Sequence, residues 1–148
     1  MKNSDPTNAA SDNADHGRIS HDSLHDDMCL FFEMSHDLFT VVSSEGRFLS
    51  VNNAWENLLG YSKDDLLKQS YTDFLHPDDV ESSGREFARA FDGSDIRRFI
   101  NRFRCKDGSV LWLEWYGKIS ADRKTMTLVG RDITDRKLLK ESYLSRKM

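Results

Sequence analysis

Residues 110–116 constrain the fold more than any other segment, because they are apolar at both alternations of a β-strand. The segment reads Val-Leu-Trp-Leu-Glu-Trp-Tyr, so large apolar side chains stand on both faces of that strand. A strand of this kind must be covered on both faces. The sequence therefore predicts a sheet with helices on one face and, on the other, an N-terminal helix or a second subunit.

Four further segments have strand character. Residues 38–43 and 47–51 are rich in β-branched and aromatic side chains and flank Ser44-Glu45-Gly46, which predicts a hairpin. Residues 125–130 form another strand-like run. Residues 97–105 alternate between two faces, one with Phe99, Asn101, Phe103 and Cys105 and the other with Arg98, Ile100, Arg102 and Arg104.

Helices are expected between and around these strands. Leu24, Met28, Phe31 and Phe32 recur at helical spacing and predict an amphipathic helix over about 21–34. Asn53 with Glu56, Ser62 with Asp65, and Ser70 with Asp73 have capping-box spacing and predict three short helices. His76-Pro77-Asp78-Asp79 starts a longer helix that ends at Asp92-Gly93, with Val80, Gly84, Phe87 and Phe91 along one face. The order of elements predicts an α+β fold with one five-stranded antiparallel sheet and short helices on one face.

Composition limits the class of protein. A length of 148 residues suits one core, and no apolar run approaches the ~20 residues of a membrane span, so we expect a cytoplasmic protein. The Asn/Asp/Ser-rich residues 1–20 are expected to be an acidic, disordered segment. Residues 1–27 carry two basic and six acidic side chains, which accounts for the whole net charge of −4. The neutral remainder argues against nucleic acid as a partner.

Four motifs resemble a known family. They are Val51-Asn52-Asn53-Ala54 with Leu58-Leu59-Gly60-Tyr61-Ser62, then Phe74-Leu75-His76-Pro77-Asp78-Asp79, then Lys106-Asp107-Gly108-Ser109 with Trp112-Leu113-Glu114-Trp115, and finally Arg131-Asp132-Ile133-Thr134-Asp135-Arg136-Lys137. In this order they resemble the PAS domain. On this resemblance we expect a capping and dimerisation helix at 21–35, the PAS domain at 36–134 and a C-terminal connector helix at 135–148.

The resemblance implies a sensory signal-input and dimerisation module without catalytic activity. Such modules belong to bacterial signalling proteins such as histidine kinases or cyclic-dinucleotide enzymes, and here the effector domain is expected to lie outside the chain. A small ligand is expected between the sheet and the long helix, at Ser82, Ser83, Gly84, Phe87, Phe99, Asn101 and Trp112. Asp132, Ile133 and Thr134 are the expected signal-coupling residues, and a homodimer is the expected assembly.

The cofactor stays unknown at this stage, and none is the favoured expectation. The family's haem histidine would fall within residues 80–84, and its adduct-forming cysteine within residues 69–74, but neither segment holds that residue. A noncovalent flavin is the alternative, because Trp112, Trp115 and Tyr116 could pack on a ring system. No metal site is expected, since His21, Asp22 and His25 lack further ligands.

Two other patterns have ordinary explanations. His76, at a helix start, is expected to cap backbone N–H groups. The basic residues Arg97, Arg98, Arg102 and Arg104 could accept an acidic ligand or a nucleic-acid backbone, but we expect them to pair with Glu114, Asp95 and neighbouring carboxylates.

Overall fold

The computed structural model of this chain describes residues 21–147, and it divides into two compact units after Glu33. The predicted disordered segment 1–20 lies outside the described residues. In the first unit, helix α2 spans His21–Met34, in agreement with the sequence prediction. Its capping and dimerisation role stays a prediction.

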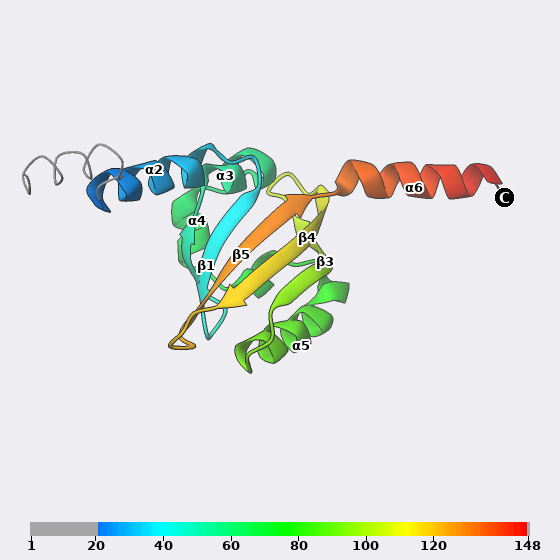
Figure 1. The fold of residues 1–148 in the computed structure, drawn as a ribbon. Coiled ribbons are helices and arrows are strands. Elements are labelled where there is room, and N and C mark those ends of the chain that lie inside the picture. Colours follow the sequence, from blue (N-terminus) through cyan, green and yellow to red (C-terminus); the bar gives the residue numbers. More distant parts are fainter. Residues whose placement is uncertain (1–20, 148) are drawn as a thin grey trace, which may run out of the picture. The chain divides into compact units, whose positions relative to one another are not determined.

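The second unit is built on one antiparallel sheet (Figure 1), and this confirms the predicted α+β class. Its strands are β1 (Leu38–Ser43), β2 (Phe48–Val51), β3 (Ile96–Arg104), β4 (Val110–Ile119) and β5 (Thr125–Asp132). They lie in the order β2-β1-β5-β4-β3, so the first and last strands of the sequence pair in the middle of the sheet.

The helices lie between the hairpin and the last three strands in sequence. They are α3 (Asn53–Leu59), α4 (Lys63–Leu67), the 3₁₀ helices η1 (Tyr71–Phe74) and η2 (Pro77–Asp79), and α5 (Val80–Phe91). Helix α5 contacts β3 and β4, whereas α3 contacts β1 and α4 contacts β2. The last helix, α6 (Thr134–Lys147), continues from the end of β5 and extends away from the sheet (Figure 1).

The predicted helix starts are confirmed at two of three sites. Ser62 accepts a hydrogen bond from the Asp65 N–H, and Ser70 forms a full capping box with Asp73. The prediction at Asn53 was wrong by one residue, because the N-cap of α3 is Asn52. The Asn52 side chain is used instead to join two chain segments, since it accepts from the Phe39 N–H and donates to the Asp37 carbonyl.

The core lies between the sheet and these helices. Its largest fully buried side chains include Trp55, Leu59, Leu66, Leu113 and Met126. Trp55 contacts Phe48, Phe103 and Trp115 in aromatic pairs with centroids 5.0–6.0 Å apart. These four aromatic side chains also line a cavity between the sheet and helix α5.

One strand departs from the predicted alternation. The register of β3 against β4 shifts between Ile96 and Phe99, and Arg98 has a φ of 52° there. Because an irregularity of this kind interrupts the two-residue period, Arg98 is not grouped with Arg102 and Arg104 by strand alternation. From Phe99 onward the predicted alternation holds, with Asn101 and Phe103 buried.

Candidate functional site

A cavity of about 50 Å³ lies between the inner face of the sheet and helix α5. Half of its fourteen lining residues are aromatic. They are Phe48, Trp55, Tyr71, Phe87, Phe99, Phe103 and Trp115. The predicted location of a ligand, between the sheet and the long helix, therefore coincides with a real cavity.

Three buried polar groups form a chain along this wall. The Trp115 indole N–H donates to Asn101 Oδ1 over 2.7 Å, and Asn101 Nδ2 donates to Ser83 Oγ over 3.0 Å. Ser83 belongs to α5, Asn101 to β3 and Trp115 to β4, so the chain ties the helix to the two strands beneath it. Buried polar groups need such partners, because each would otherwise lose its hydrogen bonds to water.

Four of the seven residues predicted from the sequence to bind a ligand line the cavity: Ser83, Phe87, Phe99 and Asn101. Ser82, Gly84 and Trp112 do not. Ser82 donates to the Asp79 carbonyl, and a Cβ built at Gly84 would meet no atom within 4 Å. Residues on either side of Ser83 point about 100° away from it on a helix, so only one of the three can face the cavity. Gly84, expected from the sequence at the ligand site, therefore lies outside the cavity wall.

Sequence reasoning missed several residues of the cavity wall. Trp115 was named only as a possible contact of a flavin ring; it follows Leu113 by two positions, so strand alternation could have placed it on the inner face. Tyr71 and Glu86 lack such a signal, because their positions depend on how η1 and α5 pack. Tyr71 packs on Phe87 with centroids 5.1 Å apart, and burial raises the pKa of its phenol.

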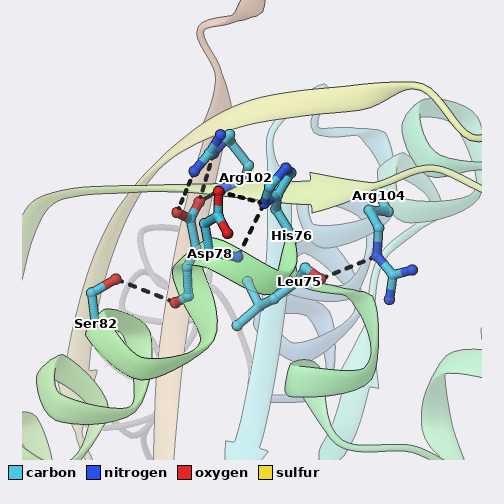
Figure 2. Close-up of polar contacts among 7 residues, drawn as sticks. Leu75, His76, Asp78, Ser82, Arg102 and Arg104 are labelled. Atoms are coloured by element: carbon cyan, nitrogen blue, oxygen red, sulfur yellow. Dashed lines mark hydrogen bonds and ion pairs between the residues drawn. The ribbon is translucent and has the colours of Figure 1, made fainter.

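A second feature, which we term the clamp, is the ion pair between Asp79 and Arg102, and neither residue lines the cavity. The dashed lines at Arg102 in Figure 2 mark its contacts. The Asp79 carboxylate accepts three hydrogen bonds from Arg102: from the backbone N–H at 2.7 Å, from Nε at 3.0 Å and from a terminal guanidinium nitrogen at 2.8 Å. These hydrogen bonds hold the pKa of Asp79 below its usual value of 3.8. The clamp joins the start of α5 to β3.

Neighbouring polar groups reinforce the clamp, as Figure 2 shows. His76 Nδ1 accepts from the Asp78 N–H at 3.1 Å, which confirms the predicted capping role of this histidine. The backbone N–H of His76 donates to the Arg102 carbonyl, and Arg104 Nε donates to the Leu75 carbonyl. The segment before α5 is thus attached to β3 at several consecutive residues.

Carboxylate partners were predicted from the sequence for the basic residues of 97–104, and the structure confirms one of the two that were named. Arg97 lies 3.6 Å from Asp95, as expected. The expected pairing of an arginine of this group with Glu114 was wrong, because Glu114 pairs with Arg136 of α6 at 3.5 Å. Arg102 uses Asp79, which precedes it by 23 residues and lies on another element.

Trp112 links the clamp to the C-terminal helix. The Arg102 guanidinium lies 5.0 Å from the centroid of its ring, and the Lys137 ammonium of α6 lies 5.1 Å from it. The backbone of the same residue holds the junction between β5 and α6. Its N–H donates to Thr134 Oγ1, and its carbonyl accepts from the Ile133 N–H, both at 2.9 Å.

The three predicted signal-coupling residues lie together at this junction. Asp132 Oδ1 accepts from both the N–H and the hydroxyl of Thr134, at 2.9 and 2.5 Å. Ile133 is buried. The helix begins at Thr134, one residue earlier than predicted, and Asp132, two residues before it, accepts from its first backbone N–H. The Thr134 hydroxyl connects Asp132 to Trp112.

The model of the PAS fold family matches residues 48–130, which is more than half of the chain. The chain belongs to the PAS fold family. Among curated proteins, this PAS domain is 30% identical over 106 residues to the White collar 1 protein of Neurospora crassa. It is 33% identical over 92 residues to the methyl sulfide methyltransferase-associated sensor of Methanosarcina acetivorans. These matches cover 69% and 61% of the chain and 9% of each relative, so the chain spans about a tenth of the length of these relatives.

Solved structures share the fold. The PAS domain resembles a domain of a sensory box sensor histidine kinase/response regulator from Geobacter sulfurreducens, with a TM-score of 0.67 and 22% identity over 76% of this chain and 97% of that one. A PAS domain from Colwellia psychrerythraea gives 0.66 and 23% over 76% and 98%. Within residues 21–147, no helix is both long and apolar enough to cross a membrane.

Proposed function

We propose that this PAS domain is a sensory signal-input and dimerisation module of a bacterial signalling protein such as a histidine kinase or a cyclic-dinucleotide enzyme. It binds a small molecule in the cavity, has no catalytic activity of its own, and works in the cytoplasm. Two relatives support the sensory role, since one is itself called a sensor and the other is a domain of a sensor histidine kinase.

One observation carries the proposal: the cavity and the clamp are held by neighbouring residues of the same two segments. Ser83 and Asn101 are bonded in the cavity wall, and Asp79 and Arg102 are bonded outside it. Asn101 and Arg102 are consecutive in β3, and Asp79 lies one helical turn before Ser83. A ligand that alters the Ser83–Asn101 bond therefore shifts α5 against β3 next to the clamp.

The clamp has a direct route to α6. A displaced Arg102 changes its contact with the Trp112 ring, which also bears Lys137 of α6. The Trp112 backbone holds Ile133 and Thr134 at the start of the same helix. We assign signal transmission to Asp132, Ile133 and Thr134 together with Trp112, which the sequence alone had suggested as a ligand contact.

This route can be tested without knowing the ligand. Ser83→Leu places a bulky side chain in the cavity, and we expect it to change the hydrogen exchange of α6 backbone amides in the full chain. Adding Trp112→Ala should abolish that change, because the ring that bears Lys137 is gone. Gly84→Leu is the matched control, since it adds the same side chain to open space on the same helix. Exchange in α6 that is identical in Ser83→Leu and the unmodified chain would contradict the proposal.

Dimerisation is proposed through the helices. Leu138, Leu139, Tyr143 and Leu144 of α6 are all more than half exposed. Helix α2 carries Leu24, Met28 and Phe31 at helical spacing. Sedimentation should show a dimer that persists after deletion of residues 1–19. A chain that stays monomeric at high concentration would exclude this part of the proposal.

A noncovalent flavin is not favoured by the geometry. Cavities that hold drug-sized ligands measure about 300–1,000 Å³, whereas this one measures about 50 Å³. A flavin was suggested by Trp112, Trp115 and Tyr116. Only Trp115 lines the cavity, so these three side chains do not form one wall around a ring system. A visible absorption band of the purified protein would reverse this assignment.

A further inference from the structure

The polar chain in the cavity wall has a forced direction. An indole N–H can only donate, so the Asn101 side chain must turn its oxygen toward Trp115. Its Nδ2 then faces Ser83 and donates to the hydroxyl oxygen. Ser83 is therefore an acceptor in this bond, and its own proton points elsewhere.

Ser83 and Asn101 each keep one proton that the two hydrogen bonds among Trp115, Asn101 and Ser83 do not use. Among the hydrogen bonds of residues 21–147, none uses the Ser83 hydroxyl proton or the second proton of Asn101 Nδ2. Both residues line the cavity and are at least 95% buried. Buried donors gain free energy when an acceptor reaches them, so this end of the cavity favours an oxygen or nitrogen acceptor on the occupant.

The charge of the wall excludes ionised occupants. No basic side chain lines the cavity, and its two titratable side chains are Glu86 and Tyr71. Glu86 is paired with Arg89 through two hydrogen bonds, of 3.0 and 2.6 Å, so its charge is already compensated. An anion would find no counter-charge there, and a cation would have to compete with Arg89.

The size of the cavity sets an upper limit on the occupant. An engineered protein cavity of about 150 Å³ holds benzene, which has six non-hydrogen atoms. A volume of about 50 Å³ is a third of that and on the same scale holds about two such atoms, so a molecule of about four is the upper limit and must widen the cavity when it enters. The remaining wall is aromatic and aliphatic, so the rest of that molecule must be apolar.

We propose that this cavity selects a compact uncharged molecule that carries one hydrogen-bond acceptor, placed against Ser83 and Asn101, on an otherwise apolar frame. This inference rests on the proposed ligand-binding function and names the chemical class of the ligand.

Three probes of four non-hydrogen atoms and similar shape test the class: acetone, isobutene and acetate. Each is titrated into the ¹⁵N-labelled full chain, while the signals of the Trp115 indole N–H, the Asn101 amide group and the Ser83 N–H are followed. Acetone should give saturable shifts at millimolar concentrations, and isobutene should bind about fivefold more weakly because it lacks the acceptor. Acetate should give no saturable shift. Acetate binding as tightly as acetone, or isobutene binding at least as tightly, would overturn the proposal.

Variants separate the hydrogen bond from simple filling. Ser83→Ala should weaken acetone binding about fivefold and leave isobutene binding unchanged. Ser83→Leu should block both probes, whereas Gly84→Leu should affect neither. Failure of all three probes to bind the unmodified chain would overturn the ligand class. The hydrogen-exchange experiment on Ser83→Leu uses no ligand, so it would still test the sensory function separately.

Discussion

Trp112 and Trp115 stand three residues apart on β4, but they serve the molecule in different ways. Trp115 is only 5% exposed, lies in the aromatic core and uses its N–H to hold Asn101. Trp112 is half-buried on the other face, where two cations lie over its ring. The inner tryptophan shapes the cavity through packing and a neutral hydrogen bond, whereas the outer one connects charged groups of separate elements. Loss of the first should damage the fold, and loss of the second should mainly affect communication.

The largest effect is expected from removing the inner tryptophan. Trp115→Ala should lower the free energy of unfolding by about 3–5 kcal/mol, because it empties a large volume of core and leaves Asn101 without its donor. Trp112→Ala should cost roughly 1 kcal/mol, mainly by the loss of cation–π contacts. Urea denaturation of both variants measures the difference. Equal losses would show that the two faces of β4 are energetically alike.

Two glycines test how tightly the inner tryptophan is packed. A Cβ at Gly130 would lie 2.6 Å from the Trp115 ring, so Gly130→Ala should destabilise the fold by about 1–3 kcal/mol. The matched variant Gly84→Ala adds the same methyl group to open space in a helix and should stabilise by about 0.5–1 kcal/mol. Thermal unfolding midpoints that move in the same direction for both variants would contradict this prediction.

The outer region is expected to respond to pH through Asp79. Its pKa is lowered in the folded state, so its ionised form stabilises the fold above pH ~4, and this contribution is lost as the pH falls through the folded-state pKa. Asp79→Asn should cost about 1–2 kcal/mol at neutral pH, because Arg102 loses a charged acceptor.

Unfolding of Asp79→Asn and the unmodified chain between pH 3 and 7 measures this contribution. The two stabilities should converge as the medium becomes acidic. A difference that stays constant down to pH 3 would show that the charge of Asp79 contributes nothing.

The smallest effect is expected at the end of the route to α6. Lys137→Met removes the ammonium above Trp112 but keeps an apolar stem, so the global stability should fall by about 0.5 kcal/mol or less. Hydrogen exchange should nevertheless speed up in the first turns of α6. Unchanged exchange there would exclude Lys137 from the route.

Much of the fold could be predicted because its signals are local. The strand over Leu38–Ser43 and the helix caps at Ser62 and Ser70 depend on residues within four positions of each other. The family motifs are local as well, and they led to the fold class that the sheet order confirms. The cavity was predicted less completely: four of the seven expected residues line it, Trp115 was named only as a possible contact of a flavin ring, and Tyr71 and Glu86 were not named at all.

The sequence by itself determined which segments become helices and strands, because capping, side-chain periodicity and turn chemistry act between near neighbours. Only the tertiary structure decided which face of helix α5 turns inward. Val80, Gly84, Phe87 and Phe91 were expected along one face of helix α5; Phe87 and Phe91 do pack against the core, but Val80 is exposed and the buried residues are Ser83 and Ala90. The clamp at Asp79 and the bond from Asn101 to Ser83 fix this rotation of the helix. The partner of Arg102 was likewise decided by packing, because Asp79 is 23 residues away and many nearer carboxylates compete for the same charge.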